Sequence, residues 1–185
     1  VENEILSSKI CRCFDCRQVL YEESMFDGQK VSKSRIITSV DYSMVSMEAF
    51  EIYATNHDIH VMDFVLKLDA YSYYMMNQLD YLTGNTDRHW GNWGFLVDNR
   101  TNQPVRLFDL MDLNQTFLAY DTPDGANCMT TGNRKMSQRE AAVEAVKNIG
   151  LNQKDEIKDE WFKVREKERE MFWCRFGILK EQWKA

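Results

Sequence analysis

Apolar residues recur at helical spacing over much of the chain after residue 46, which predicts that helices make up most of the structure. A short helix is expected around Met47 to Asn56. A stronger pattern runs from Val61 to Leu82 and stops before Gly84, a residue type that tolerates the left-handed backbone found just past helix ends. The methionines and tyrosines of this pattern are interpreted as core filling.

Two further helices are predicted in the last third of the chain. Ser137 and Glu140 have the spacing of a capping box ahead of an alanine-rich run, and Gly150 follows as a stop signal. From Lys154 to the end, charged residues alternate with apolar ones. This pattern predicts a long amphipathic helix, broken at Gly177.

The pattern changes to short strand-like runs in the middle of the chain. Residues 93–97 and 105–108 are such runs, and residues 98–104 between them are rich in turn formers. We therefore expect a β-hairpin from about Trp93 to Asp109.

The first part of the chain carries weaker signals. Short alternations from Lys9 to Tyr21 suggest one or two strands, and the polar stretch from Phe26 to Arg35, which contains Gly28, is the expected hinge. The fold class predicted from these patterns is α+β and mostly helical.

Composition narrows the class of protein. A chain of 185 residues with 44% hydrophobic residues and two prolines is expected to form one packed domain. The net charge is −6, and the basic residues are interleaved with acidic ones, so we expect no nucleic-acid partner. No apolar run reaches the roughly 18 to 20 residues that cross a bilayer, and the polar start does not resemble a signal peptide.

The cysteines also bear on location and chemistry. Five cysteines do not form a secreted disulfide framework, which favours a reducing cytoplasm. Cys11, Cys13 and Cys16 are close enough in sequence to share a metal, but a closed zinc site needs four ligands, and His57 and His60 are distant. Free thiols in or beside a strand are the favoured interpretation.

The candidate chemistry lies in GlyAsnThrAspArgHisTrpGlyAsn, residues 84–92, between the long helix and the hairpin. Asp87 can accept the proton of an attacking hydroxyl, and Asn92 offers an amide oxygen to a hard cation. Asp109, at the end of the second hairpin strand, offers a charged oxygen for magnesium. The order and the step of five residues from Asp to Asn follow the kinase pattern of catalytic loop and metal-binding aspartate.

Each of these residues alone also has a structural interpretation, as a turn, cap or strand-end residue. The ordered trio in its helix, loop and hairpin context favours function. For His89 the alternatives are contact with phosphate and support of the loop, and for Arg88 they are pairing with a carboxylate and pairing with phosphate.

These motifs resemble a known family. The run from residue 79 to residue 94, followed by PheLeuValAsp and LeuPheAsp, resembles the catalytic core of bacterial HipA-like serine/threonine kinases. The AspArgHis-x-x-Asn pattern is also similar to that of phosphatidylinositol kinases. The HipA-like resemblance implies ATP and magnesium as cofactors, with Asp87 as the catalytic aspartate and Asn92 and Asp109 as metal ligands.

The same resemblance implies a division of the chain. Residues 35–185 would form the helical C-lobe of a kinase-like fold, and residues 1–34 a remnant of the N-lobe or the lobe junction. The sequence has no GlyxGlyxxGly loop and no Walker motif. A kinase of this type normally has an N-lobe of about a hundred residues upstream, for which the chain has too little room. We therefore expect a C-terminal fragment, a truncated product or one part of a split protein.

Three functions remain in competition. The first is a protein serine/threonine kinase with a protein substrate and an antitoxin-like or N-lobe-supplying partner. The second is a non-catalytic kinase lobe that binds a partner, and the third is a small-molecule or lipid kinase that uses the same loop chemistry.

Overall fold

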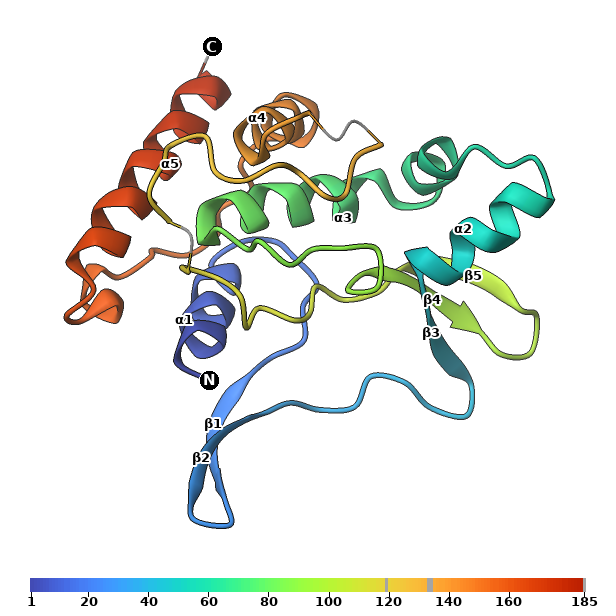
Figure 1. Cartoon of the computed structure of the whole chain (residues 1–185), viewed down its shortest axis with the longest axis horizontal. Coiled ribbons are helices and arrows are strands. Elements are labelled where there is room, and N and C mark those ends of the chain that lie inside the picture. The colour runs from blue at the N-terminus through green and yellow to red at the C-terminus, as the bar shows by residue number, and fades with distance from the viewer. Residues whose placement is uncertain (119, 133–134, 185) are drawn as a thin grey trace.

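The computed structural model describes residues 1–118, 120–132 and 135–184 (Figure 1). Its helices are α1 (Glu2–Cys11), α2 (Met47–Asn56), α3 (Val61–Thr83), α4 (Gln138–Ile149) and α5 (Glu166–Lys184), with a 3-10 helix, η1 (Asp159–Phe162). Its strands are β1 (Glu22–Phe26), β2 (Gln29–Lys33), β3 (Tyr42–Ser46), β4 (Gly94–Asp98) and β5 (Gln103–Leu107). The α+β class predicted from the sequence is confirmed.

Helix α3 runs through the middle of the molecule and packs against α4, α5 and β5 (Figure 1). Its second half carries the core, where Met75, Leu79 and Leu82 are fully buried. The predicted helix and its end are confirmed, because Gly84 has a φ of 63°. The sequence did not predict the kink at Asp69, whose carboxylate accepts the amide of Ser72 at 3.2 Å and so caps the second half.

The strands form two antiparallel sheets. β3, β4 and β5 lie in that order, which confirms the predicted hairpin and adds β3, a strand that the sequence patterns did not predict. β1 and β2 form a separate ribbon that extends away from the helical body (Figure 1).

The capping box at the start of α4 is confirmed. Ser137 accepts the amide of Glu140 at 3.2 Å, and the Glu140 carboxylate accepts the amide of Ser137 at 2.7 Å. The hydrogen bond from the Ser137 backbone lowers the pKa of Glu140. Gly150 follows the helix, as predicted.

The prediction of strands from Lys9 to Tyr21 is wrong. Residues Glu2–Cys11 form α1, and the chain then continues without regular structure up to β1, with isolated bridges at Phe14 and Gln18. The physical reason is burial on several sides of the helix, where Ser7 and Ser8 are covered as well as the apolar residues. A helix without a clear polar face has no clear periodicity in its sequence.

The polar stretch from Phe26 to Arg35 is not simply a hinge. Asp27 and Gly28, with φ of 48° and 74°, form the tight turn between β1 and β2, and most of the remaining stretch is β2 itself. The stretch is polar because the ribbon is largely exposed. Residues 34–41 then connect the ribbon to β3 without regular secondary structure.

The long C-terminal helix begins later than predicted and has no break. A turn at Lys163, with φ of 50°, separates η1 from α5. α5 continues through Gly177, whose neighbours Phe176 and Leu179 are buried. Burial of these side chains offsets the cost of about 1 kcal/mol that glycine brings to a helix interior.

The division into residues 1–34 and 35–185 stays a prediction. In the structure α1 shares the core of the helical body, and the rings of Phe14 and Phe176 lie 6.5 Å apart in an edge-to-face contact. Among the described residues, no helix is long and apolar enough to cross a membrane.

Candidate active site

Arg88 fixes the loop that connects α3 to β4. Its guanidinium forms two hydrogen bonds with the Asp80 carboxylate, at 2.9 and 3.0 Å, and both side chains are almost completely buried. It also donates to the carbonyl oxygens of Asn92 at 2.8 Å and Met111 at 2.6 Å. Burial disfavours the charged form, but Asp80 more than offsets this, so the pKa of Arg88 is raised. Arg88 therefore pairs with a carboxylate and supports the loop.

Asn85 provides a second point of attachment. Its amide nitrogen donates to Asp80 at 3.1 Å and to the carbonyl oxygen of Asp112 at 3.3 Å. Its amide oxygen accepts the backbone N–H of Asp87 at 3.2 Å. From α4, Gln138 donates to the Asn85 carbonyl oxygen at 2.6 Å. The loop before Asp87 is thus held by buried polar groups on both sides, which favours one fixed geometry.

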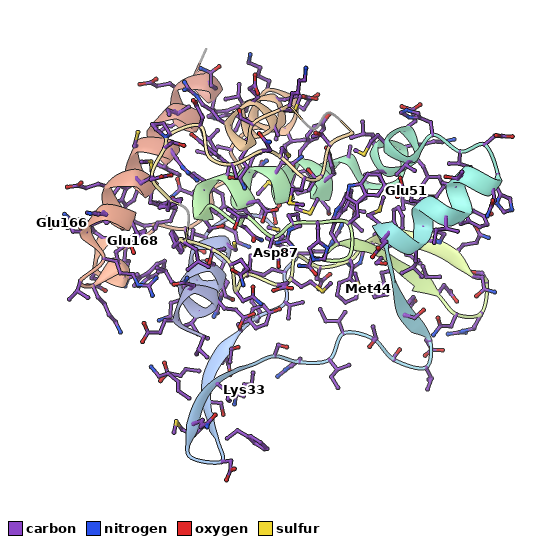
Figure 2. The ribbon with its side chains drawn as sticks, viewed as in Figure 1. Lys33, Met44, Glu51, Asp87, Glu166 and Glu168 are labelled. Atoms are coloured by element: carbon purple, nitrogen blue, oxygen red, sulfur yellow. The ribbon has the colours of Figure 1, made fainter. Side chains whose placement is uncertain are left out.

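Asp87 and Asn92 are in direct contact. The Asn92 amide nitrogen donates to the backbone oxygen of Asp87 at 2.8 Å and to its carboxylate at 3.3 Å. Both of these hydrogen bonds use the nitrogen, so the amide oxygen of Asn92 is the atom suited to bind a cation. The Asp87 side chain is 42% exposed, which lets a substrate hydroxyl reach it. In Figure 2 it lies below α3, between α1 and β3.

His89 supports the same loop. Its Nδ1 accepts the backbone N–H of Gly91 at 3.0 Å, which places the proton of the neutral ring on Nε2. Nε2 lies 3.7 Å from the Asp87 carboxylate. His89 therefore holds the backbone and faces the candidate catalytic carboxylate.

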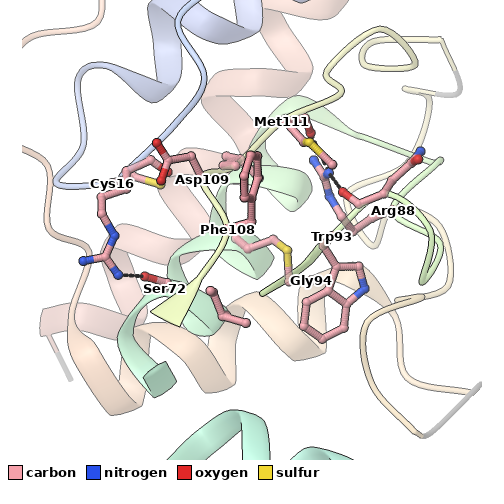
Figure 3. Close-up of a pocket in the computed structure, with 13 residues that line it drawn as sticks. Cys16, Ser72, Arg88, Trp93, Gly94, Phe108, Asp109 and Met111 are labelled. Carbon is pink, nitrogen blue, oxygen red and sulfur yellow. Dashed lines mark hydrogen bonds between the residues drawn. The ribbon is translucent and has the colours of Figure 1, made fainter. Parts of the chain in front are cut away.

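Asp109 lies just after β5 and forms an ion pair with Arg106 at 2.5 Å. It shares a cavity of about 20 Å³ with Asn92, Cys16 and Arg88. Figure 3 shows Asp109 beside Cys16 at one end of this cavity. Asp87 does not line this cavity. The structure therefore places Asp87 in contact with Asn92, and it places Asn92 and Asp109 on the same cavity. A cavity of this volume holds about one water molecule and is too small for a nucleotide.

The sequence patterns missed Asp112, which lies three residues after Asp109. Its φ is 53°, a left-handed value that few residues other than glycine adopt. Tyr21 accepts its backbone N–H at 3.1 Å, and Asn85 donates to its carbonyl oxygen. The available signal was its position, because Asp112 also follows the hairpin, as a metal-binding aspartate of a kinase does.

The donor atoms suit magnesium better than a softer metal. Asn92 offers an amide oxygen, and Asp109 and Asp112 offer carboxylates. Magnesium uses one or two protein carboxylates and takes its other ligands from phosphate and water. Among the described residues, no group of three His, Cys, Asp or Glu side chains is placed to hold a metal.

The thiols of the cysteine cluster lie in largely buried surroundings. Cys11 and Cys13 are buried, and burial raises the pKa of both thiols. Burial also raises the pKa of Cys16 to about 12. Burial therefore disfavours the reactive thiolate form of these side chains. Cys11 ends α1, while Cys13 and Cys16 lie in the irregular segment after it.

An open groove of about 840 Å³ is also lined in part by Asp109, Cys16 and Arg17. Basic side chains contribute much of its lining: Lys9, Arg12, Arg17, Lys154 and Lys158. Asp155 and Glu156 add negative charge, and Trp161 adds an aromatic surface. Cations of this kind attract phosphate groups, although the groove has no glycine-rich loop to enclose them.

The fold, with a fixed polar loop between a long helix and a hairpin, is similar to that of a kinase. The similarity is to the kinase CtkA of Helicobacter pylori, a protein described as proinflammatory. The two structures align with a TM-score of 0.65 and 15% sequence identity, over 99% of this chain and 79% of the CtkA chain. No protein-family model matches the chain, and no curated protein matches its sequence. At this identity the likeness establishes the fold alone.

Proposed function

We propose that this protein is an ATP- and magnesium-dependent phosphotransferase, specifically a protein serine/threonine kinase of the HipA-like type. The observation that carries the proposal is the contact between Asp87 and Asn92, on a loop fixed by the buried pair of Arg88 and Asp80. The kinase-like fold supports it independently.

In this mechanism Asp87 accepts the proton of the substrate hydroxyl and orients its oxygen for attack on the terminal phosphate. Asn92, held by its bonds to Asp87, presents its amide oxygen to magnesium. A magnesium ion held there would supply the positive charge that offsets the charge of the phosphate groups. Arg88 and His89 keep the loop in place throughout.

Two carboxylates compete for the role of charged metal ligand. Asp109 was expected from the sequence, and its pairing with Arg106 uses Oδ1, which leaves Oδ2 to bind a cation. Asp112 is connected to the loop of Asp87 by the hydrogen bond from Asn85, and it forms no ion pair within the described part of the chain. We keep both as candidates, because a single experiment separates them.

The arrangement of the chain supports a role for a partner. Residues 1–34 are proposed as the lobe junction, in which the β1–β2 ribbon would continue into an N-lobe sheet. Met25 and Phe26, at the tip of the ribbon, are largely exposed. A protein partner that supplies the N-lobe would cover them, and the nucleotide would then be enclosed from both sides.

The same exposed ribbon also favours the second candidate, a non-catalytic kinase lobe that binds a partner. Exposed apolar side chains on an unpaired ribbon are typical of docking surfaces. This candidate predicts partner binding without metal-dependent nucleotide binding.

Binding of Mn²⁺ in the presence of ATP to the protein completed with an N-lobe, followed by electron paramagnetic resonance, tests the proposal. Asn92→Ala should raise the dissociation constant for Mn²⁺ at least about tenfold, because a ligand to the metal is lost. Asp109→Asn and Asp112→Asn identify the charged ligand. Only one of these two variants should raise the dissociation constant for Mn²⁺ as much as Asn92→Ala does. Asp63→Asn, at the exposed start of α3, is the control. Wild-type protein without any bound Mn²⁺ would contradict the proposal.

A further inference from the structure

Asp112 has a conformation that needs external support. Its φ of 53° lies in the left-handed region, which is unfavourable for a residue with a side chain. Such conformations persist where surrounding contacts hold them, and they are concentrated at functional sites. The question is which groups hold Asp112.

Side chains from distant segments bind the backbone on both sides of this residue. The Tyr21 hydroxyl accepts the Asp112 N–H at 3.1 Å, and Asn85 donates to the Asp112 carbonyl oxygen at 3.3 Å. One residue earlier, Arg88 donates to the carbonyl oxygen of Met111. Asn85 and Arg88 belong to the loop of Asp87, so only Tyr21 comes from outside it.

Tyr21 is itself fixed in place. Its backbone N–H donates to the hydroxyl of Ser8, a buried residue of α1, at 3.2 Å. It directly precedes Glu22, the first residue of β1. Burial raises the pKa of the Tyr21 hydroxyl, which therefore stays neutral near pH 7. The anchored hydroxyl oxygen is thus placed to accept the Asp112 N–H.

We propose that Tyr21 is a positioning residue of the phosphotransferase site: its hydroxyl holds the backbone of Asp112 so that the carboxylate serves as the charged magnesium ligand. This inference rests on the proposed function and deepens it. It also links the ribbon to the site, because a movement of β1 reaches Asp112 through the hydroxyl of Tyr21.

Tyr21→Phe in the full chain, completed with an N-lobe, removes the acceptor and keeps the ring. We expect the dissociation constant for Mn²⁺ in the presence of ATP to rise about threefold to tenfold, the effect of one lost hydrogen bond. Hydrogen exchange of the Asp112 amide, measured by NMR without metal, should accelerate by a similar or larger factor. Asp112→Asn should weaken Mn²⁺ binding more strongly than Tyr21→Phe.

Tyr71→Phe is the matched control. The Tyr71 hydroxyl donates to the carbonyl oxygen of Asp15 at 2.9 Å, so it anchors the same segment without touching Asp112. Unchanged Mn²⁺ affinity or unchanged Asp112 exchange in Tyr21→Phe would overturn the inference, as would an equal effect of Tyr71→Phe. Wild-type protein that binds no Mn²⁺ would instead refute the proposed function, and the role of Tyr21 with it.

Discussion

At the scale of single residues, the site depends on buried polar contacts that the sequence does not display. The AspArgHis-x-x-Asn spacing predicted the contact between Asp87 and Asn92, because five residues of loop can return on themselves. It did not predict that Asp80, one turn before the end of α3, would pair with Arg88. That pair forms only when the helix and the loop pack together, so it depends on tertiary structure and cannot be seen in the sequence pattern.

The pair of Asp80 and Arg88 gives the first stability prediction. Asp80→Asn leaves the Arg88 guanidinium buried without its opposite charge, which should lower the free energy of unfolding by about 3 to 5 kcal/mol. Urea denaturation followed by circular dichroism measures the change. Asp41→Asn is the control, because its pair with Arg100 is exposed and worth at most about 1 kcal/mol. Equal losses of unfolding free energy in the two variants would show that the buried pair contributes no more stability than the exposed pair.

At the scale of elements, the sequence predicted those whose periodicity is clear. α2, α3, α4 and the hairpin of β4 and β5 have one buried face or a marked turn, and all four are confirmed. α1 was missed because it is covered on several sides, and the full extent of its burial depends on the rest of the fold. The start of α5 was misplaced because charges alternate in η1 and in the loop before it as well.

Two glycines, one at the end of a helix and one inside a helix, allow a matched test of the backbone geometry. Gly84→Ala should destabilise the protein by at least about 1 to 3 kcal/mol, because Gly84 has a positive φ and a Cβ there would lie 2.3 Å from the Tyr120 ring. Gly177→Ala should stabilise it by about 0.5 to 1 kcal/mol, because the added methyl group meets no atom within 4 Å. Thermal unfolding of both variants measures the two effects. A stabilising Gly84→Ala or a strongly destabilising Gly177→Ala would contradict the geometry.

At the scale of the whole molecule, the kinase-like fold was accessible from the sequence only through the motif around Asp87. Periodicity gave the helices and the hairpin but not their arrangement. The ribbon of β1 and β2 was hidden in a stretch interpreted as a hinge, since an exposed two-stranded ribbon has no buried face to mark it. The proposed lobe junction rests on the family resemblance and stays a prediction.

The central claim is that Asp87 carries phosphoryl transfer and that the nucleotide needs an N-lobe to be held. We expect the 185-residue chain alone to bind magnesium-ATP weakly or not at all and to turn over little, and a protein completed with an N-lobe to be active.

The most direct measurement is the rate of phosphoryl transfer from ATP by the completed protein and by its Asp87→Ala variant. The variant should be slower by at least about a hundredfold while its circular dichroism spectrum stays the same, because only a positioned acid-base group is lost. An Asp87→Ala protein as fast as the unchanged one would contradict the mechanism.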